Sequence, residues 1–216
     1  MRGAGGLPAL HPSRLPVTGL ALKLIVGLGN PGGQYARTRH NAGWWFVDAL
    51  LARQHGSWRH ERQLNCDLAR VRVAESELWL AKPTAFMNRS GGPAAAIAQF
   101  YRIAPQEMLF VHDDIDLPPG VARLKEGGGH GGHNGLRDVI EHLGADFWRL
   151  RLGVGHPGSR DLVLDAVLDR PTAAEQLLID EAVQRGLDAL PELLSAGAQR
   201  AMHQLHRRAP PDPSVS

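Results

Sequence analysis

A polar loop in the first quarter of the chain contains a residue suited to acid–base chemistry. The loop follows an apolar run at 23–28, and it carries His40. An imidazole exchanges its proton near neutral pH, so a histidine beyond a strand end can act as a general base. A lone loop histidine is nevertheless more often an ordinary surface residue. The same loop also carries the polar residues Asn30, Tyr35, Arg37, Arg39 and Asn41.

A carboxylate-rich segment, HDDID at 112–116, offers a partner for such a histidine. It ends the apolar run at 108–112, which predicts a second buried strand. One of its acids could orient an imidazole, as in a catalytic dyad. We assign Asp114 and Asp116 to turn formation, because the sequence PPG follows at once.

A metal ion is the alternative use of these side chains. Such a site would need several ligands at one focus, yet the available spacings match no zinc motif and no HExxH sequence is present. We therefore expect no metal and no cofactor. The candidate ligands are His112, Asp113, His130 and His133.

A glycine-rich segment, GGGHGGHNG at 127–135, has six glycines among nine residues. No Lys-Ser or Lys-Thr pair follows, so it is not a phosphate-binding P-loop. Because two histidines and Asn134 are interspersed, binding or closure over a substrate is favoured over a plain linker. A further segment, KPTAFMNRS at 82–90, ends a predicted hairpin, and Ser90 fits the N-cap of the next helix.

The stretch GLGNPG at 27–32 matches the GxGxxG dinucleotide fingerprint literally. In a dinucleotide-binding unit the helix opens at the glycines. Here Pro31 continues an irregular loop, the next helical pattern begins near Gly43, and Asp48 falls inside that helix. The context argues against nucleotide binding.

The elements that position these segments alternate along the chain. The predicted strands are 23–28, 65–73, 78–81, 108–112, 121–126 and 149–154. The predicted helices are 43–54, 90–103, 134–143, 161–168 and 172–196, with a kink at Pro191. This alternation predicts an α/β fold: a single domain with a central mixed, mostly parallel sheet flanked by helices on both faces. Ligand sites in such sheets lie beyond the carboxyl ends of strands, where the unusual segments fall.

Composition sets the outer limits. The chain has 216 residues, 43% of them hydrophobic and 21% charged, which fits one globular domain. We predict a disordered leader at 1–20, the domain at 21–208 and a loose tail at 209–216. Proline interrupts any signal-peptide core, and no apolar run is long enough to cross a bilayer. The single cysteine, Cys66, suits a reducing cytoplasm, and a net charge of +2 gives only weak evidence for a polyanionic partner.

Taken together, these segments resemble the bacterial peptidyl-tRNA hydrolase family. The resemblance runs from about residue 23 to 206 and rests on GLGNPGGQYARTRHNAG, KPTAFMNRSG, VHDDIDLPPG, GGGHGGHNGLRD and RLGVGHPG in this order. It implies a monomeric α/β enzyme that cleaves the ester between a peptide and the 3′ end of tRNA without a metal.

The resemblance also implies roles for individual residues. His40 would be the catalytic base, Asp113 would stabilise its reactive form, and Asn30 would help recognise the blocked amino group of the peptide. Residues expected at the tRNA acceptor end or the peptide are Tyr35, Phe86, Asn88 and Asn134, with Met87 and His133 lining the cleft. Residues expected at the tRNA 5′ phosphate are Arg123, Lys125 and Arg151.

Two positions depart from the family pattern, one within the set of phosphate-binding residues and one next to it. Position 123 is often lysine there; Arg123 keeps the charge with a different geometry. Glu126 places an acid next to the phosphate-binding residues and would weaken tRNA affinity.

The implied chemistry suits these residue types. An imidazole can take a proton from water, a carboxylate favours the resulting imidazolium, and asparagine amides can donate to the developing oxyanion. No GxSxG elbow is present, so a covalent acyl-enzyme is not indicated. Two other functions stay open: a module that only holds RNA ends, and a nucleotide-dependent oxidoreductase.

Overall fold

The computed structural model describes residues 19–206, except the side chain of Arg160. The predicted tail at 209–216 and nearly all of the predicted leader at 1–20 lie outside the described residues, so both remain predictions. At the start of the described part, the backbone N–H of Leu20 donates to the carbonyl of Leu193.

Seven strands form one mixed sheet in the order β2-β3-β4-β1-β5-β7-β6. The central strands β4, β1, β5 and β7 run parallel, while β2, β3 and β6 are antiparallel to their neighbours. The strands are β1 Leu24–Gly27, β2 Arg59–Glu61, β3 Cys66–Val73, β4 Ser76–Pro83, β5 Met108–Asp114, β6 Ala122–Glu126 and β7 Trp148–Gly153.

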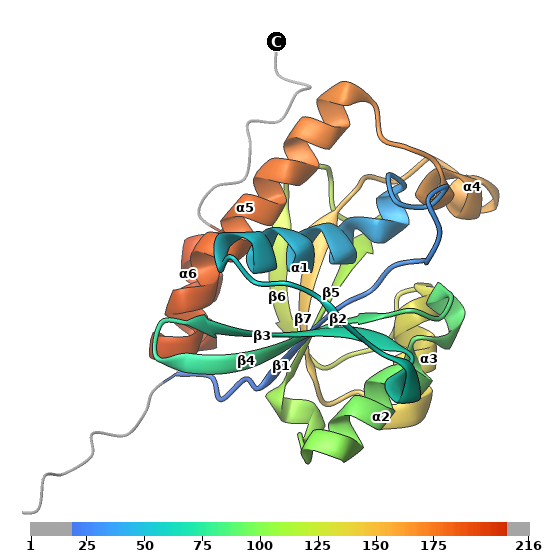
Figure 1. Cartoon of the computed structure of the whole chain (residues 1–216). Coiled ribbons are helices and arrows are strands. Elements are labelled where there is room, and N and C mark those ends of the chain that lie inside the picture. Colours follow the sequence, from blue (N-terminus) through green and yellow to red (C-terminus); the bar gives the residue numbers. More distant parts are fainter. Residues whose placement is uncertain (1–18, 207–216) are drawn as a thin grey trace, which may run out of the picture.

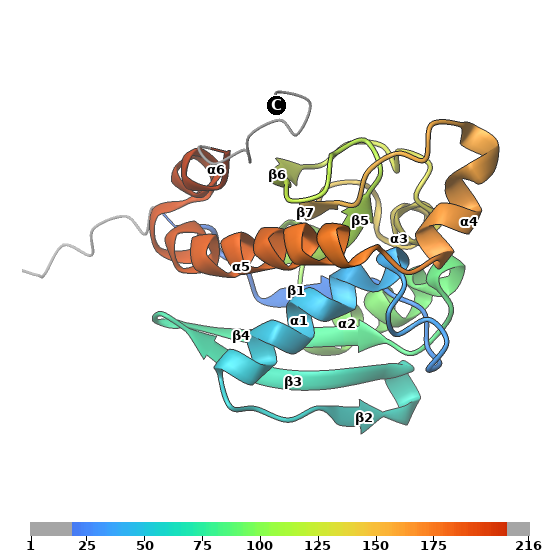
Figure 2. The same ribbon diagram turned by 90° about the horizontal axis from the view of Figure 1, so that it is seen from above.

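Helices cover both faces of the sheet, as Figures 1 and 2 show. The α-helices are α1 Ala42–Arg53, α2 Gly91–Tyr101, α3 Asn134–Leu143, α4 Val163–Leu168, α5 Ala173–Ala196 and α6 Ala198–His206. Short 3₁₀ turns are η1 Arg39–Asn41, η2 Arg62–Leu64, η3 Met87–Arg89, η4 Pro105–Glu107 and η5 Arg160–Leu162. The predicted α/β class and the helices on both faces are confirmed.

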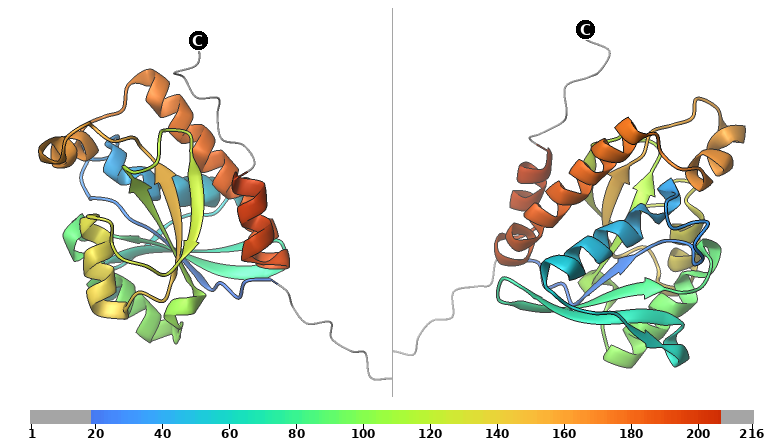
Figure 3. Two further views of the ribbon diagram at one scale, coloured as in Figure 1. Left: turned by 180° about the vertical axis from the view of Figure 1, so that it is seen from behind. Right: turned by 45° about the horizontal axis from the view of Figure 1, so that its top comes forward.

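Two apolar layers account for this arrangement. Alternate side chains of β1 and β5, such as Ile25 and Leu109, pack with α1, α5 and α6 on one face. Their neighbours, such as Val26 and Phe110, pack with α2 and α3 on the other (Figure 3). Strands buried on both faces require continuous apolar runs, which is why these two strands are easily recognised in the sequence.

Two elements were not predicted from the sequence. The edge strand β2 has the sequence RHE, which carries no apolar alternation. Helix α6 follows Gly197, whose φ of 92° ends α5, and this short helix was not predicted. The helix predicted at 172–196 agrees with α5, which has Pro191 inside it. In the described part of the chain, no helix is long and apolar enough to cross a membrane.

Candidate active site

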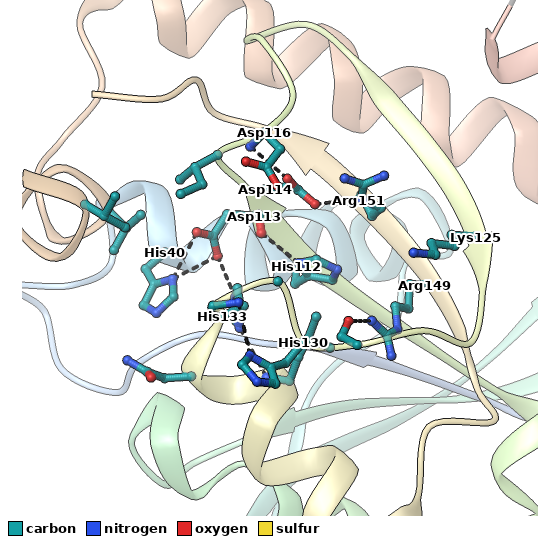
Figure 4. A pocket seen from close by; sticks show the side chains of 18 of the residues that line it. His40, His112, Asp113, Asp114, Asp116, Lys125, His130, His133, Arg149 and Arg151 are labelled. Carbon is teal, nitrogen blue, oxygen red and sulfur yellow. Dashed lines mark hydrogen bonds and ion pairs between the residues drawn. The ribbon is translucent and has the colours of Figure 1, made fainter. Parts of the chain in front are cut away.

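A hollow of about 380 Å³ lies at the carboxyl ends of β5 and β7 (Figure 4). Its walls come from the end of β5, the glycine-rich segment, the first turn of α3, β7 and α4. This is the edge at which parallel sheets place their ligands. The loop that follows β1 brings His40 to the same edge.

His40 and Asp113 form a buried hydrogen-bonded pair in this hollow. Nδ1 of His40, on η1, lies 2.9 Å from Oδ1 and 3.0 Å from Oδ2 of Asp113, at the end of β5. The two residues are only 6% and 2% exposed. A carboxylate can only accept, so Nδ1 donates its proton and Nε2 keeps its lone pair. The free nitrogen of His40 is therefore the basic one.

A second imidazole shares the same carboxylate. Nε2 of His133 lies 3.0 Å from Oδ1 of Asp113. On its other side, Nδ1 of His133 accepts the backbone N–H of Leu136 and caps α3. A ring that accepts at Nδ1 and donates at Nε2 is neutral, so His133 acts as a neutral donor to Asp113.

The charges in this group follow from burial and pairing. Burial alone would lower the pKa of His40, but the carboxylate of Asp113 more than offsets it, and the pKa is raised above 6.5. Burial lowers the pKa of His133 despite the nearby carboxylate. Burial would raise the pKa of Asp113, yet the two imidazoles hold it far below its usual range. Asp113 is thus ionised at every physiological pH.

His40, Asp113 and His133 are also close enough to be considered as metal ligands, since their nearest donor atoms lie within 4.8 Å of one another. The hydrogen bonds argue against this use. A neutral histidine that binds a metal through Nε2 carries its proton on Nδ1, and Nδ1 of His133 already accepts from Leu136. These three side chains are therefore arranged for proton transfer and not for binding a metal ion.

His112 lies beside this group and was considered only as a metal ligand in the sequence. Its Nδ1 donates to the carbonyl of Asp113 at 2.7 Å, while its buried Nε2 has no partner among the described residues. Burial and the neighbouring His133 lower the pKa of His112 to about 3. The ring is therefore neutral and packs edge-on against His133, with 5.0 Å between the ring centroids.

Asn30 is held in place by groups that the sequence did not connect to it. Its backbone N–H donates to Oδ1 of Asn41 at 2.9 Å, and Nδ2 of Asn41 donates back to its carbonyl at 3.0 Å. Oδ1 of Asn30 accepts the N–H of Met87 at 2.8 Å. With this oxygen occupied, the remaining group of Asn30 is an amide donor. Asn41 is fully buried next to His40, and its positioning role was missed.

The remaining residues expected near the acceptor end fall into two sets. Asn134, at the start of α3, lines the hollow with His133. Tyr35, Phe86 and Asn88 do not line it. Tyr35 and Phe86 meet edge-on with 6.2 Å between ring centroids, and Phe86 is 53% exposed. Asn30 connects the second set to η1, because it bonds both to Asn41, in η1, and to Met87, next to Phe86.

Cationic side chains occupy the other end of the hollow. Figure 4 shows Lys125, Arg149 and Arg151 on the opposite side of His112 from His40. Arg123 faces Arg151 across the β6–β7 pair but does not line the hollow. Arg149 does line it and was missed by the sequence analysis. The alternation of the strand puts the side chain of Glu126 on the opposite face from Lys125, away from these cations.

The turn assignment for the two neighbouring acids is confirmed. The backbone N–H of Asp116 donates to Oδ1 of Asp114 at 2.9 Å. The other oxygen of Asp114 accepts from Nε of Arg151 at 2.6 Å. Asp114 therefore shapes the turn and also orients one of the cations.

Comparison with known proteins identifies a family for this chain. The family model described as peptidyl-tRNA hydrolase matches residues 24–212. A peptidyl-tRNA hydrolase of Acidithiobacillus ferrooxidans is 53% identical over 184 residues, which cover 85% of this chain and 97% of that protein. One of Neisseria meningitidis is 48% identical over 188 residues, covering 87% and 98%.

Solved structures give the same result for the fold. The crystal structure of peptidyl-tRNA hydrolase from Acinetobacter baumannii superposes with a TM-score of 0.85 at 43% identity, covering 88% of this chain and 96% of that one. A complex of peptidyl-tRNA hydrolase with N-propanol gives a TM-score of 0.86 at 42% identity, covering 89% and 98%.

Proposed function

Because the chain belongs to the peptidyl-tRNA hydrolase family, we propose that it hydrolyses peptidyl-tRNA with a water molecule activated by His40. The bond cleaved is the ester between the peptide and tRNA, and the reaction recycles the tRNA. The observation that carries the mechanism is the buried His40–Asp113 pair, which leaves Nε2 of His40 with a lone pair in a substrate-sized hollow.

The proton movements follow from this geometry. Nε2 of His40 takes a proton from water while the hydroxide oxygen bonds to the ester carbonyl carbon. The imidazolium that results is stabilised by the ionised Asp113. When the tetrahedral intermediate collapses, the C–O bond to the ribose breaks and His40 returns the proton to the departing ribose oxygen. The products are a free tRNA 3′ end and a peptide carboxylic acid, which loses its proton to solvent and becomes a carboxylate.

Amide donors support the developing negative charge and the peptide carbonyls. Asn30 is suited to this role, because Met87 occupies its oxygen and leaves only its donor for the substrate. It would thereby help to recognise the blocked amino group of the peptide. Asn88 and Asn134 would act on the substrate in the same way. Met87 and His133 would line the cleft between them.

The tRNA would be bound through its acceptor end and its 5′ phosphate. Lys125 and Arg151 line the hollow and would bind the phosphate, while Arg123 would act from its rim. The exposed ring of Phe86, with Tyr35 against it, is suited to stacking on a base. We propose that the enzyme acts as a cytoplasmic monomer.

The experiment that tests this function compares N-acetylated with unblocked aminoacyl-tRNA, each with and without a metal chelator. We expect amino-acid release from the blocked substrate only, and the same rate in chelator. Binding of both tRNAs without release would support a holding module instead. Loss of release in chelator would contradict the metal-free mechanism.

A further inference from the structure

Arg149 is a buried cation that has no acidic partner in the described part of the chain. The residue is only 2% exposed, although it lines the cationic end of the hollow. Its side-chain partners in residues 19–206 are two backbone carbonyls and the ring of Phe147, at 4.8 Å from the ring centroid. Nε is buried and unpartnered within the same part of the chain. A buried charge without a counter-charge costs stability, so Arg149 is an expensive residue to place at this position.

The two carbonyls belong to the glycine-rich segment. Nη1 of Arg149 donates to Gly129 and Nη2 to Gly128, so the planar guanidinium holds two successive peptides. Gly128 has a φ of 95°, a conformation that glycine adopts readily and other residues rarely do. A side-chain carbon on Gly128 would lie 2.8 Å from Nζ of Lys125. Arg149 therefore fixes the backbone surface on which the ammonium of Lys125 lies.

The neighbouring charges make this end of the hollow suited to an anion. Arg151 has Asp114 as a counter-charge, but no carboxylate pairs with Arg149 or Lys125 among the described residues. Burial, and then the positive charge of Arg151, lower the pKa of Arg149. An anion bound between Lys125 and Arg151 would relieve this repulsion, and a dianion would do so more than a monoanion.

The same segment reaches the proposed catalytic pair. Beyond Gly129, the carbonyl of His130 accepts the backbone N–H of His133 at 2.9 Å. The side chain of His133 in turn donates to Asp113. The chain held by Arg149 thus runs from the cationic end of the hollow to the carboxylate that orients His40.

We propose that Arg149 is a positioning residue for a phosphate-monoester subsite: its guanidinium holds Gly128 and Gly129 beneath Lys125, and its uncompensated charge makes the subsite selective for a terminal phosphate. This inference rests on the proposed function, because the phosphate is that of the tRNA 5′ end. It adds Arg149, which lines the hollow, to Lys125 and Arg151, while Arg123 stays at the rim.

The test measures how strongly the enzyme distinguishes N-acetylated aminoacyl-tRNA carrying a 5′ phosphate from the same substrate treated with phosphatase. We expect wild-type enzyme to favour the phosphorylated form by at least about tenfold in kcat/KM, mostly through KM, as for a charge-assisted contact. Arg149→Met should reduce this preference to less than about threefold, with little change in KM for the dephosphorylated form. Arg149→Lys keeps the charge but loses the two-carbonyl fork, so it should regain part of the preference.

Arg72→Met is the matched control, because Arg72 is an exposed arginine on β3, toward the other end of the sheet. It should keep the wild-type preference. A folded Arg149→Met that also keeps it, or a wild-type enzyme that shows none, would overturn the proposal. If Arg149→Met does not fold, Arg149→Lys decides alone: an unchanged KM for the phosphorylated substrate would refute the positioning role.

Binding of uncharged tRNA, with and without its 5′ phosphate, separates this inference from the proposed hydrolysis. Fluorescence anisotropy gives the Kd for each tRNA. The preference for the phosphorylated tRNA should be largest for the wild type, smaller for Arg149→Lys and smallest for Arg149→Met. A protein that binds tRNA with this preference but releases no amino acid would contradict the hydrolysis and leave the Arg149 subsite supported.

Discussion

Nε2 of His133 donates to Asp113 across 3.0 Å, at the same carboxylate oxygen that faces Nδ1 of His40. The carboxylate that orients the proposed base is therefore shared between two imidazoles. One of them, His133, is kept neutral by burial and by its role as the cap of α3. The other, His40, has its pKa raised by the same carboxylate, so the two rings are set for different tasks.

The pH dependence of the reaction should report on His40. The base works only when neutral, and its pKa in the folded enzyme lies above 6.5. We expect kcat/KM to fall on the acid side with a midpoint above pH 6.5. In Asp113→Asn the charge that raises the pKa is gone while burial remains, so the midpoint of the residual activity should move below that of the wild type. A midpoint that does not move in this variant would show that Asp113 does not set the pKa of the base.

Removing the second imidazole should move the midpoint the other way. Asn is a good helix N-cap, so His133→Asn keeps a cap for α3 while it removes the imidazole donor to Asp113. The carboxylate then interacts with His40 alone, and we expect the acid-side midpoint of kcat/KM to rise above that of the wild type. His130→Asn is the control, because His130 lines the hollow without a hydrogen bond to Asp113. Equal midpoints in the two variants would contradict the shared carboxylate.

The buried Asn41 should matter for stability. Asn41→Ala leaves the backbone N–H and carbonyl of Asn30 without partners in a buried site, at a cost of about 1–3 kcal/mol in the free energy of unfolding. Urea denaturation measures it. Asn88→Ala removes an exposed amide and should change the free energy by less than about 0.5 kcal/mol. Similar losses in both variants would mean that the Asn30–Asn41 pair does not hold the loop.

Helix α1 approaches the sheet so closely that its second residue has to be glycine. A Cβ at Gly43 would lie 2.3 Å from the carbonyl oxygen of Val111 and 2.6 Å from the backbone nitrogen of Leu28. We expect Gly43→Ala to lower the unfolding free energy by about 1–3 kcal/mol and to lower kcat, since the adjoining η1 carries His40. Gly33→Ala, with no atom within 4 Å of the added carbon, is the control for thermal unfolding. A Gly43→Ala enzyme as stable as this control would be inconsistent with the packing.

The sequence predicted those helices and strands whose buried positions form a regular apolar pattern along the chain. Helix α3 was predicted at 134–143 and is found there, because its apolar positions recur at helical spacing. The strand predicted at 108–112 extends to Asp114. Its last two residues are acidic and belong to the site, so they do not continue the apolar run from which the strand was predicted. The strand predicted at 78–81 runs from Ser76 to Pro83, because its polar ends pair with β3 without adding to the apolar run.

Site residues could be predicted from the sequence where the side-chain type itself indicates the chemistry. Residues whose role depends on the folded geometry could not. His40 and Asp113 could be singled out because imidazole and carboxylate are reactive, and the structure places them in contact. Asn41 could not be connected to Asn30, because their pairing depends on how the loop closes. Arg149 and Arg151 are two residues apart in β7 and therefore share one face, a pattern visible in the sequence. Only the structure shows that Arg149 binds the glycine-rich segment.

The central claim is that His40 supplies the base, and the most direct measurement of it is the single-turnover rate of peptide release from saturating N-acetylated aminoacyl-tRNA. We predict that His40→Ala lowers this rate by about 10²–10⁴-fold while the variant remains folded and binds tRNA about as well as the wild type. A folded His40→Ala enzyme that releases its peptide at close to the wild-type rate would contradict the account.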